Sequence, residues 1–213
     1  MKNLTPVEIR ILGSLVEKEL TTPEYYPMSV NAVTNACNQK NNRDPVTHYD
    51  EITVSNELEN LKDKLLVGKV LGIGSRVPKY RHLLGQAYSL YESEIPILTV
   101  MMLRGPQTIG ELRSRTASMK EYPSLEVVEE VVNRLIEREV PLVRQLPVQP
   151  GKKENRYMHL LGGEPELSLY QMESKSVHHD SDKLKILEDQ ILEMKNELDV
   201  LKSQFAEFRK QFE

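Results

Sequence analysis

Two short stretches decide the fold: KYRHLL at residues 79–84 and, 77 positions later, RYMHLL at residues 156–161. A second pair lies upstream of them, where PMSVNAV at 27–33 aligns with PQTIGEL at 106–112. Two matches at almost the same offset indicate that a whole structural unit is repeated, because an isolated motif would leave nothing upstream to align. We therefore expect two copies of one small module.

Each copy carries the same order of helix signals. Apolar residues at helical spacing precede the aligned prolines, Pro27 and Pro106, and a longer apolar stripe follows each of them. These stripes are Val54, Leu58, Leu61 and Leu65 in one copy and Val128, Val131, Leu135 and Ile136 in the other. Segments 5–8 and 108–111 have the form of capping boxes. The predicted helix caps are Thr5, Asp50, Thr108 and Ser124.

Strand-like segments broken by Gly and Pro end each copy, at 66–84 and 141–161. Alternation along a strand puts the Tyr and His of the repeated motif on one face, where we expect them to pack the hairpin onto the helices. Three helices closed by a β-hairpin form the winged-helix plan. The predicted fold is therefore mainly α with small β-hairpins (α+β), with tandem winged-helix modules at 1–85 and 86–163.

A polar run at 164–182 is predicted to be a linker, and a helix with a strict heptad pattern is predicted at 183–213. Its a and d positions are Leu184, Leu187, Ile191, Met194, Leu198, Leu201, Phe205, Phe208 and Phe212. So narrow an apolar seam is typical of helices that pair, so we expect a coiled coil and a homo-oligomer, most simply a homodimer. The alternative is that this helix folds back on its own modules.

Composition sets limits on the class of protein. The 213 residues are 39% apolar with a net charge of −4, and no stretch reaches the ~20 apolar residues of a membrane span. Charged residues interrupt the N-terminal apolar run, which excludes a signal peptide. The single Cys37 excludes an internal disulfide. We therefore expect a cytoplasmic protein without a membrane partner.

The residues do not assemble a recognisable catalytic or metal site. Cys37 has no neighbouring His and is interpreted as a small core residue. The HHD triplet at 178–180 is not a complete ligand set, and GIGS at 72–75 leads into a strand rather than a helix. The prediction is a protein that is not an enzyme, with no catalytic residues, metal or cofactor.

Positive charge is concentrated in the two hairpins, or wings. These candidate nucleic-acid-binding residues are Lys69, Arg76, Lys79, Arg81, Arg144, Lys152, Lys153 and Arg156. By contrast, the third helices, near 50–66 and 124–139, each carry five acidic and two basic residues, a poor charge for entry between phosphates. One interpretation is that these wing residues contact DNA. The other is that they are surface charges of the hairpins that interact only with water.

The polar segment TNACNQKNNRDP at 34–45 has no counterpart in the second copy. Together with arginines of LRGPQTIGELRSR at 103–115 it is a candidate interaction surface, although its amides also suit helix capping. The residues of this surface are Asn35, Asn38, Gln39, Lys40, Asn42, Arg43, Arg104, Arg113 and Arg115. An interaction or inter-module role is preferred to capping alone.

Four blocks of sequence carry a family resemblance: residues 4–46, SRVPKY at 75–80, LRGPQTIGELRSRT at 103–116 and PGKKENRYMHLLGGE at 150–164. They resemble the YceH-like family of bacterial proteins, which has tandem winged-helix modules and an uncharacterised function. The resemblance implies the fold and a helical, heptad-bearing end. It implies no activity, so it supplies no catalytic residues.

The leading functional hypothesis is a non-enzymatic regulator that dimerises through its last helix and binds DNA through its wings. The alternative is a protein–protein adaptor, similar to the tandem winged-helix subunit of bacterial condensin, which would use its acidic third helices and the 34–45 segment to hold an unidentified protein partner. Basic wings favour the first hypothesis and acidic helices favour the second.

Overall fold

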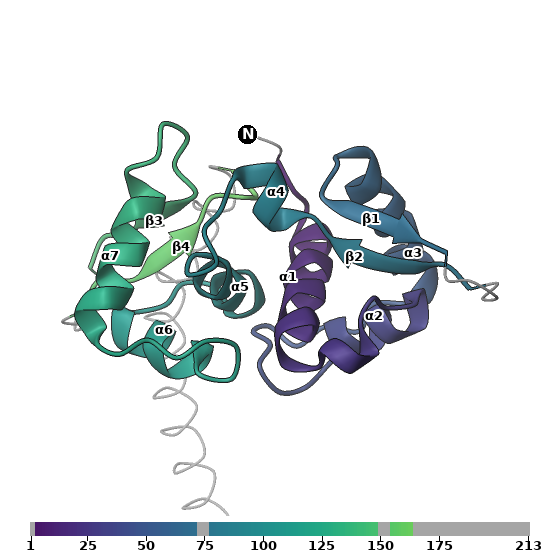
Figure 1. The fold of residues 1–213 in the computed structure, drawn as a ribbon, viewed down its shortest axis with the longest axis horizontal. Helices are drawn as coiled ribbons and strands as arrows, with labels where there is room; N and C mark the ends of the chain where they lie inside the picture. Colours follow the sequence, from purple (N-terminus) through teal and green to yellow (C-terminus); the bar gives the residue numbers. More distant parts are fainter. Residues whose placement is uncertain (1–2, 72–76, 149–153, 164–213) are drawn as a thin grey trace, which may run out of the picture. The chain divides into compact units, whose positions relative to one another are not determined.

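The computed structural model describes residues 3–71, 77–148 and 154–163 (Figure 1). The first half contains α1 (Pro6–Thr21), the 3-10 helix η1 (Pro23–Tyr25), α2 (Val30–Cys37), α3 (Glu51–Asp63), β1 (Val67–Val70) and β2 (Lys79–His82). After α4 (Leu84–Tyr88), the second half contains α5 (Ile95–Arg104), α6 (Ile109–Thr116), α7 (Leu125–Ile136), β3 (Val143–Gln145) and β4 (Tyr157–His159). The predicted linker and coiled coil lie outside the described residues.

The α+β class is confirmed, because the described residues form seven α-helices and two antiparallel strand pairs, β1–β2 and β3–β4. Three helices followed by two strands occur once in each half (Figure 1). The short helix α4 that connects the halves was not predicted from the sequence, because its five residues are too few to show a helical period.

Every predicted helix cap is confirmed. Thr5 and Thr108 form complete capping boxes with Glu8 and Glu111, and Pro6 occupies the first turn of α1. The side chains of Asp50 and Ser124 accept backbone N–H bonds at the starts of α3 and α7. These local signals were readable because a cap depends on only three or four consecutive residues.

The repeated tyrosine adds a third segment to each hairpin. The backbone of Tyr80 exchanges two hydrogen bonds with Met28, at 2.7 and 3.1 Å, and Tyr157 does the same with Gln107, at 2.8 and 2.9 Å. Both partners directly follow the prolines of the aligned upstream motifs. The two sequence matches therefore recur together because each pair forms one bridge in the fold.

The repeated histidine shapes the turn that leaves each hairpin. His82 Nδ1 accepts the N–H of Leu84 at 3.3 Å, and His159 Nδ1 accepts the N–H of Leu161 at the same distance. Tyr80, Tyr157 and His159 are buried. This confirms the interpretation that the motif packs each hairpin onto its helices.

One predicted core position is wrong. Leu65 was placed in the apolar stripe of α3, but it is 70% exposed, with φ of 58°. The helix ends at Asp63, and Leu65 enters the left-handed region, so the chain turns and Leu66 fills the core instead. The helical spacing of apolar residues was extended past Asp63, where α3 ends, and so it selected Leu65 in place of its buried neighbour Leu66.

Helix α1 packs against helix α5 and so joins the two halves (Figure 1). Gly13 lies at this contact. A Cβ atom added to Gly13 would lie 3.0 Å from Leu103 Cδ2 and 3.1 Å from Met102 Cβ, so only glycine allows the helices to approach this closely. Two backbone bonds of 2.9 Å, Leu4 N to Leu161 O and Asp44 N to Leu103 O, also join the halves.

Replacing Gly13 with leucine is expected to lower the free energy of unfolding by about 1–3 kcal/mol, because the new side chain overpacks the α1–α5 contact. The matched control is Gly110→Ala in α6, where the nearest atom to an added Cβ is 3.9 Å away. Removing a helical glycine there should stabilise the protein by up to about 1 kcal/mol. Urea denaturation of both variants checks this, and a Gly13→Leu protein as stable as wild type would contradict the assigned packing.

Candidate nucleic-acid and partner surfaces

The outer face of the β1–β2 hairpin carries exposed positive charge. Lys79 and Arg81 point away from the helices, because they alternate with the inward-facing Tyr80 and His82 along β2. Neither Lys79 nor Arg81 forms an ion pair within the part of the chain that the structure describes. Their charges are therefore available to a ligand.

Gly68 makes room for Arg81. It stands opposite Arg81 in the strand register, and a Cβ added there would lie 3.3 Å from Arg81 Nε and 3.4 Å from its Cγ. The arginine stem can lie across β1 because this position has no side chain. A glycine in mid-strand thus has a local reason, which is the close approach of the arginine.

The other candidate wing residues differ in availability. Lys69 Nζ lies 2.9 Å from a carboxylate oxygen of Glu59 and 5.7 Å from the centre of the Tyr80 ring, so its charge is already paired. Arg156 is paired with Glu111 at 2.9 Å. Arg144 lies on β3 with its side chain exposed and also has an interaction partner. Arg76, Lys152 and Lys153 lie outside the described residues.

Several acidic side chains of α3 are engaged by neighbours. Glu59 contacts Lys62 and Lys69, and these hydrogen bonds lower the pKa of its carboxyl to about 2. Glu51 accepts a 2.6 Å bond from Asn31 Nδ2. The net charge of −3 counted on this segment therefore overstates how strongly α3 repels an anion, since Lys69 from the hairpin offsets part of it.

Helix α7 is different, because its acidic side chains face solvent. Glu126, Glu129 and Glu130 are exposed, and none forms an ion pair with another described residue. A hydrogen bond from the Ser124 side chain lowers the pKa of Glu126, which keeps that carboxylate charged. The two third helices thus present different electrostatic surfaces.

The 38–49 connection contains an inward-pointing arginine. Arg43, predicted at the interaction surface, is instead buried, with its side chain fully enclosed. Its guanidinium forms a bidentate pair with Glu17, at 2.7 and 3.0 Å, and its Nε donates to Ala36 O at 3.0 Å. Arg43 therefore braces the connection from inside and cannot contact a partner directly.

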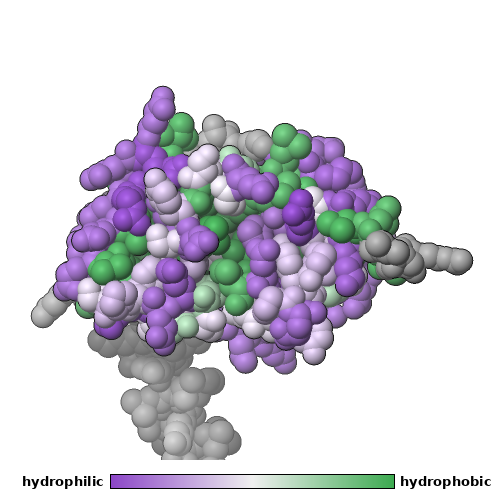
Figure 2. All heavy atoms as spheres, in the orientation of Figure 1, coloured by the Kyte–Doolittle hydropathy of each residue, from purple (hydrophilic) through white to green (hydrophobic). Residues whose placement is uncertain are grey.

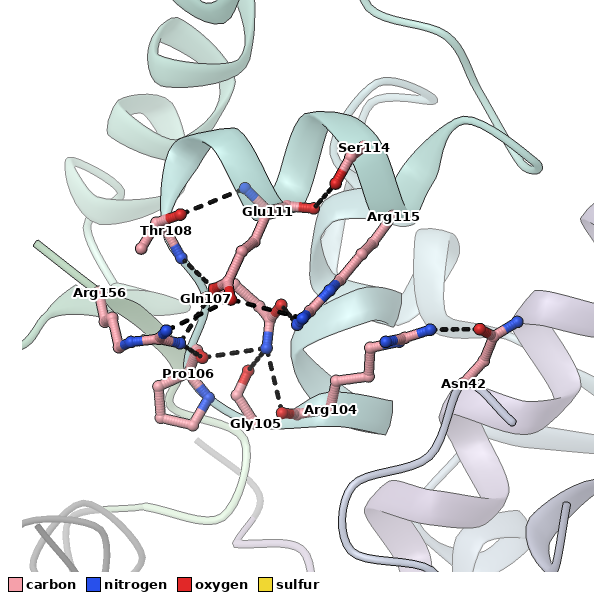
Figure 3. Close-up of polar contacts among 10 residues, drawn as sticks. All are labelled: Asn42, Arg104, Gly105, Pro106, Gln107, Thr108, Glu111, Ser114, Arg115 and Arg156. Carbon is pink, nitrogen blue, oxygen red and sulfur yellow. Dashed lines mark hydrogen bonds and ion pairs between the residues drawn. The ribbon is translucent and has the colours of Figure 1, made fainter. Parts of the chain in front are cut away.

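The amides of this segment divide between two tasks. Asn38 exchanges hydrogen bonds of 2.7 and 2.8 Å with the backbone of Tyr49, which is a local brace. Asn42 reaches the second half, where its Oδ1 accepts a bond from the Arg104 guanidinium (Figure 3). Both the capping use and the contact between the halves that the sequence suggested are therefore present.

The remaining candidates of this surface are placed separately. Lys40 is exposed and Gln39 is half-buried, while the exposed Asn35 donates to Asn31 Oδ1 at 3.2 Å. Arg113 donates to the carbonyl oxygens of Tyr122 at 3.3 Å and Pro123 at 3.0 Å. It thereby lines a groove of about 690 Å³ between α6 and the start of α7, which includes Leu125.

A polar network occupies the turn between α5 and α6 (Figure 3). Gln107 is buried, and its Nε2 donates to three consecutive carbonyl oxygens, those of residues 104–106, at 3.0 to 3.2 Å. Its Oε1 accepts a bond from Arg115, while Glu111 pairs with Arg156. Gln107 and Glu111 were not among the predicted site residues. A comparison of the two aligned copies could have identified them, because the first copy has the apolar residues Met28 and Ala32 at the equivalent positions.

Cys37 is fully buried, and desolvation raises the pKa of its thiol to about 11. Such a thiol stays protonated at neutral pH and is a poor nucleophile, which confirms its interpretation as a core residue. Within the described ranges, no three His, Cys, Asp or Glu residues gather at metal-binding spacing. No helix among them is long and apolar enough to cross a bilayer.

Polar side chains cover much of the outer helices on the face shown in Figure 2, and apolar ones gather between the halves and near the end of the β1–β2 hairpin. Leu71 and Val77 flank that end and are 70% and 56% exposed. An exposed, partly apolar hairpin end with basic residues beside it has the composition of a contact surface for a large partner.

Burial lowers the pKa of His159 from 6.5 to about 4. Because the unfolded state then binds a proton at higher pH than the folded state, stability is complete above pH 6.5 and is lost as pH falls towards 4. Between pH 7 and 5 the free energy of unfolding should drop by about 2 kcal/mol from this group.

The variant His159→Asn, which keeps an acceptor for the Leu161 N–H, should remove that part of the pH dependence. Denaturant unfolding at pH 7 and pH 5 measures it, with the exposed His48→Asn as control. An unchanged pH dependence in His159→Asn would show that this histidine is not held neutral.

A family model described as "Protein of unknown function, DUF480" matches residues 4–152. The chain is 45% identical over 216 residues to the UPF0502 protein of Geotalea uraniireducens (strain Rf4), covering 95% of this chain and 98% of that one. It is 44% identical over 216 residues to UPF0502 protein GSU0233 of Geobacter sulfurreducens, covering 99% and 98%. The UPF0502 protein of Geotalea daltonii is 53% identical over 168 residues, covering 79% and 77%.

Proposed function

The chain belongs to the uncharacterised bacterial family DUF480, and we propose that within it this protein is a non-enzymatic DNA-binding protein of the tandem winged-helix type. The observation that carries this proposal is the outer face of the β1–β2 hairpin, where Lys79 and Arg81 are exposed and unpaired within the described chain. The repeated order of three helices and two strands supports the winged-helix assignment.

DNA contact is assigned chiefly to the first half. There, Lys62 and Lys69 offset the charge of Glu59 on α3, and the hairpin beside it adds Lys79 and Arg81. The exposed carboxylates of α7 would instead repel a phosphate backbone. We therefore expect α7, the third helix of the second half, to contribute less to DNA binding than α3 does.

The proposal includes several features beyond this surface. The chain is taken to be YceH-like, cytoplasmic and regulatory, and to homodimerise through the predicted coiled coil at 183–213. Dimerisation would place two copies of the basic hairpin on one duplex. The second copy would raise affinity through effective concentration without any new type of contact.

Binding of the full-length protein to a fluorescent random-sequence duplex, followed by anisotropy as salt rises from 50 to 200 mM, tests the proposal. Because each phosphate contact contributes about 0.9 to the slope of log K against log salt, two contacts should give a slope near −2 per protomer. The absence of binding at 50 mM salt would reject a general DNA-binding function.

A protein–protein adaptor is the second candidate, and the acidic face of α7 favours it. The adaptor role predicts that this face binds a basic partner surface and stays remote from DNA. Replacing Glu126, Glu129 and Glu130 with glutamine should then leave DNA affinity within about threefold of wild type, because charges beyond a Debye length are screened. A large gain in DNA affinity would place α7 against the duplex and weaken the adaptor role.

A further inference from the structure

The polar network at the α5–α6 turn is absent from the equivalent turn of the first half. Helices α2 and α6 are both eight residues long, and their caps Ser29 and Thr108 align at the same offset, so positions can be compared directly. The residues Arg104, Gln107, Glu111 and Arg115 correspond to Tyr25, Met28, Ala32 and Ala36.

The first half forms the same backbone bridge without these polar side chains, although its chain enters the bridge differently, through η1 and the cis Tyr26–Pro27 bond rather than through Gly105. Met28 and Ala36 are buried there, and Met28 makes the same pair of backbone bonds to Tyr80 that Gln107 makes to Tyr157. The network is therefore not required to form the bridge. Its charged members need an additional explanation, because partly buried charges are costly unless they are compensated.

Charge in the network is not balanced. Arg104, Arg115 and Arg156 supply three guanidinium groups, and Glu111 is the carboxylate that pairs with two of them, Arg115 and Arg156. Arg156 donates hydrogen bonds to both oxygens of that carboxylate, at 2.9 and 3.3 Å, and Arg115 forms a longer ion pair with it, at 3.4 Å. Asp44 and the Arg43–Glu17 pair also act on Arg104, so four positive charges stand against three negative ones and the local excess is +1.

Neutral amides hold the two remaining guanidinium groups in place. Arg104 donates to Asn42 Oδ1, and Arg115 donates to Gln107 Oε1 (Figure 3). An amide oxygen orients a guanidinium without cancelling its charge, so further N–H donors remain for another acceptor. Desolvation and, next, the charge of Arg115 lower the pKa of Arg104, whereas Glu17 and Asp44 act in the opposite direction. The two arginines repel each other, and a bound anion would relieve that repulsion.

We propose that Arg104 and Arg115 bind a phosphate group at the junction of the two halves. Paired guanidinium groups match the charge and the several oxygens of phosphate better than they match a single hydroxyl or amide. Asn42 comes from the first half and Arg104 from the second, so the site is complete only when the halves are packed together. The phosphate is either a DNA phosphodiester, in which case the site extends the proposed function, or a free phosphate group.

Thermal unfolding of the full-length protein in inorganic phosphate and in chloride of equal ionic strength tests the site. Phosphate at ten times its Kd should raise the midpoint of wild type by about 3–5 °C. The double variant Arg104→Gln/Arg115→Gln should lose this gain. Phosphate also stabilises proteins non-specifically, so the difference between proteins is the readout. Arg113→Gln, an arginine of the same helix held by backbone carbonyls, should respond like wild type.

DNA binding by the same variants identifies the source of the phosphate. A salt slope that falls by about 1–2 in the double variant assigns the site to a phosphodiester. An unchanged slope, together with a lost phosphate response, assigns it to a free phosphate group. Equal phosphate responses in the double variant and wild type would overturn the phosphate site. DNA binding through Lys79 and Arg81 is tested separately, so this result would leave the proposed function unaffected.

Discussion

Replacing Lys79 and Arg81 with glutamate is expected to weaken binding to random-sequence DNA on the order of a hundredfold at 0.1 M salt. Loss of two phosphate contacts accounts for about 60-fold, and repulsion by the new carboxylates adds to it. Both side chains are exposed on the outer face of β2, so the fold should tolerate the change. The slope of log K against log salt should become shallower by about 1.8.

The control for this result carries the same change in net charge elsewhere, as Lys120→Glu/Lys175→Glu. Lys120 is exposed in the α6–α7 connection, and Lys175 belongs to the predicted linker. DNA affinity of this control should stay within about fivefold of wild type, because a change in total charge acts weakly at a distance. Equal losses in the two variants would mean that net charge, and not the hairpin face, governs binding.

Replacing Arg43 with alanine is expected to lower the free energy of unfolding by about 3–5 kcal/mol, because it leaves the buried Glu17 carboxylate with only the more distant Lys18, at 3.7 Å. The Arg43 side chain is fully enclosed and that of Glu17 is 9% exposed, so water screens the pair little. Bonds from Arg43 to Ala36 O and Asn42 O would also be lost. Removing them should loosen the 38–49 connection that carries Asn42 to the second half.

Two further variants separate this explanation from simple loss of side-chain volume. The double variant Glu17→Leu/Arg43→Met removes both charges and should recover most of the stability, whereas Lys40→Ala at the surface should change it by less than about 0.5 kcal/mol. Urea unfolding monitored by far-UV circular dichroism measures all three. A loss below about 1 kcal/mol in Arg43→Ala would show that the ion pair is not important for stability.

Features that depend on neighbouring residues were predictable from the sequence. The capping boxes at Thr5 and Thr108 and the hairpin motif around Tyr80 follow from short patterns, and the offset between the copies fixed the order of elements. The sequence also favoured an interaction or inter-module role for the polar segment 34–45 over capping alone. It did so because the segment had no counterpart in the second copy and so no role in the repeated module itself.

Features that depend on distant partners were not predictable. Arg43 looked like a surface arginine because its partner, Glu17, is 26 residues away on α1. Lys69 looked free because no local pattern pairs β1 with Glu59 of α3. Charge counting along single segments therefore exaggerated both the acidity of α3 and the number of available basic residues. Only side-chain placement separates Lys79 and Arg81 from the wing residues that are already paired.

Photo-crosslinking to DNA from two exposed apolar positions tests the central claim most directly. A photoreactive phenylalanine analogue replaces either Val77, 56% exposed beside β2, or Leu125, 44% exposed at the start of α7, in the full-length protein. If the first hairpin holds the phosphate backbone, irradiation with a random-sequence duplex will crosslink position 77 and leave position 125 uncrosslinked. Crosslinks from 125 without any from 77 would contradict the assignment of DNA contact to the β1–β2 hairpin.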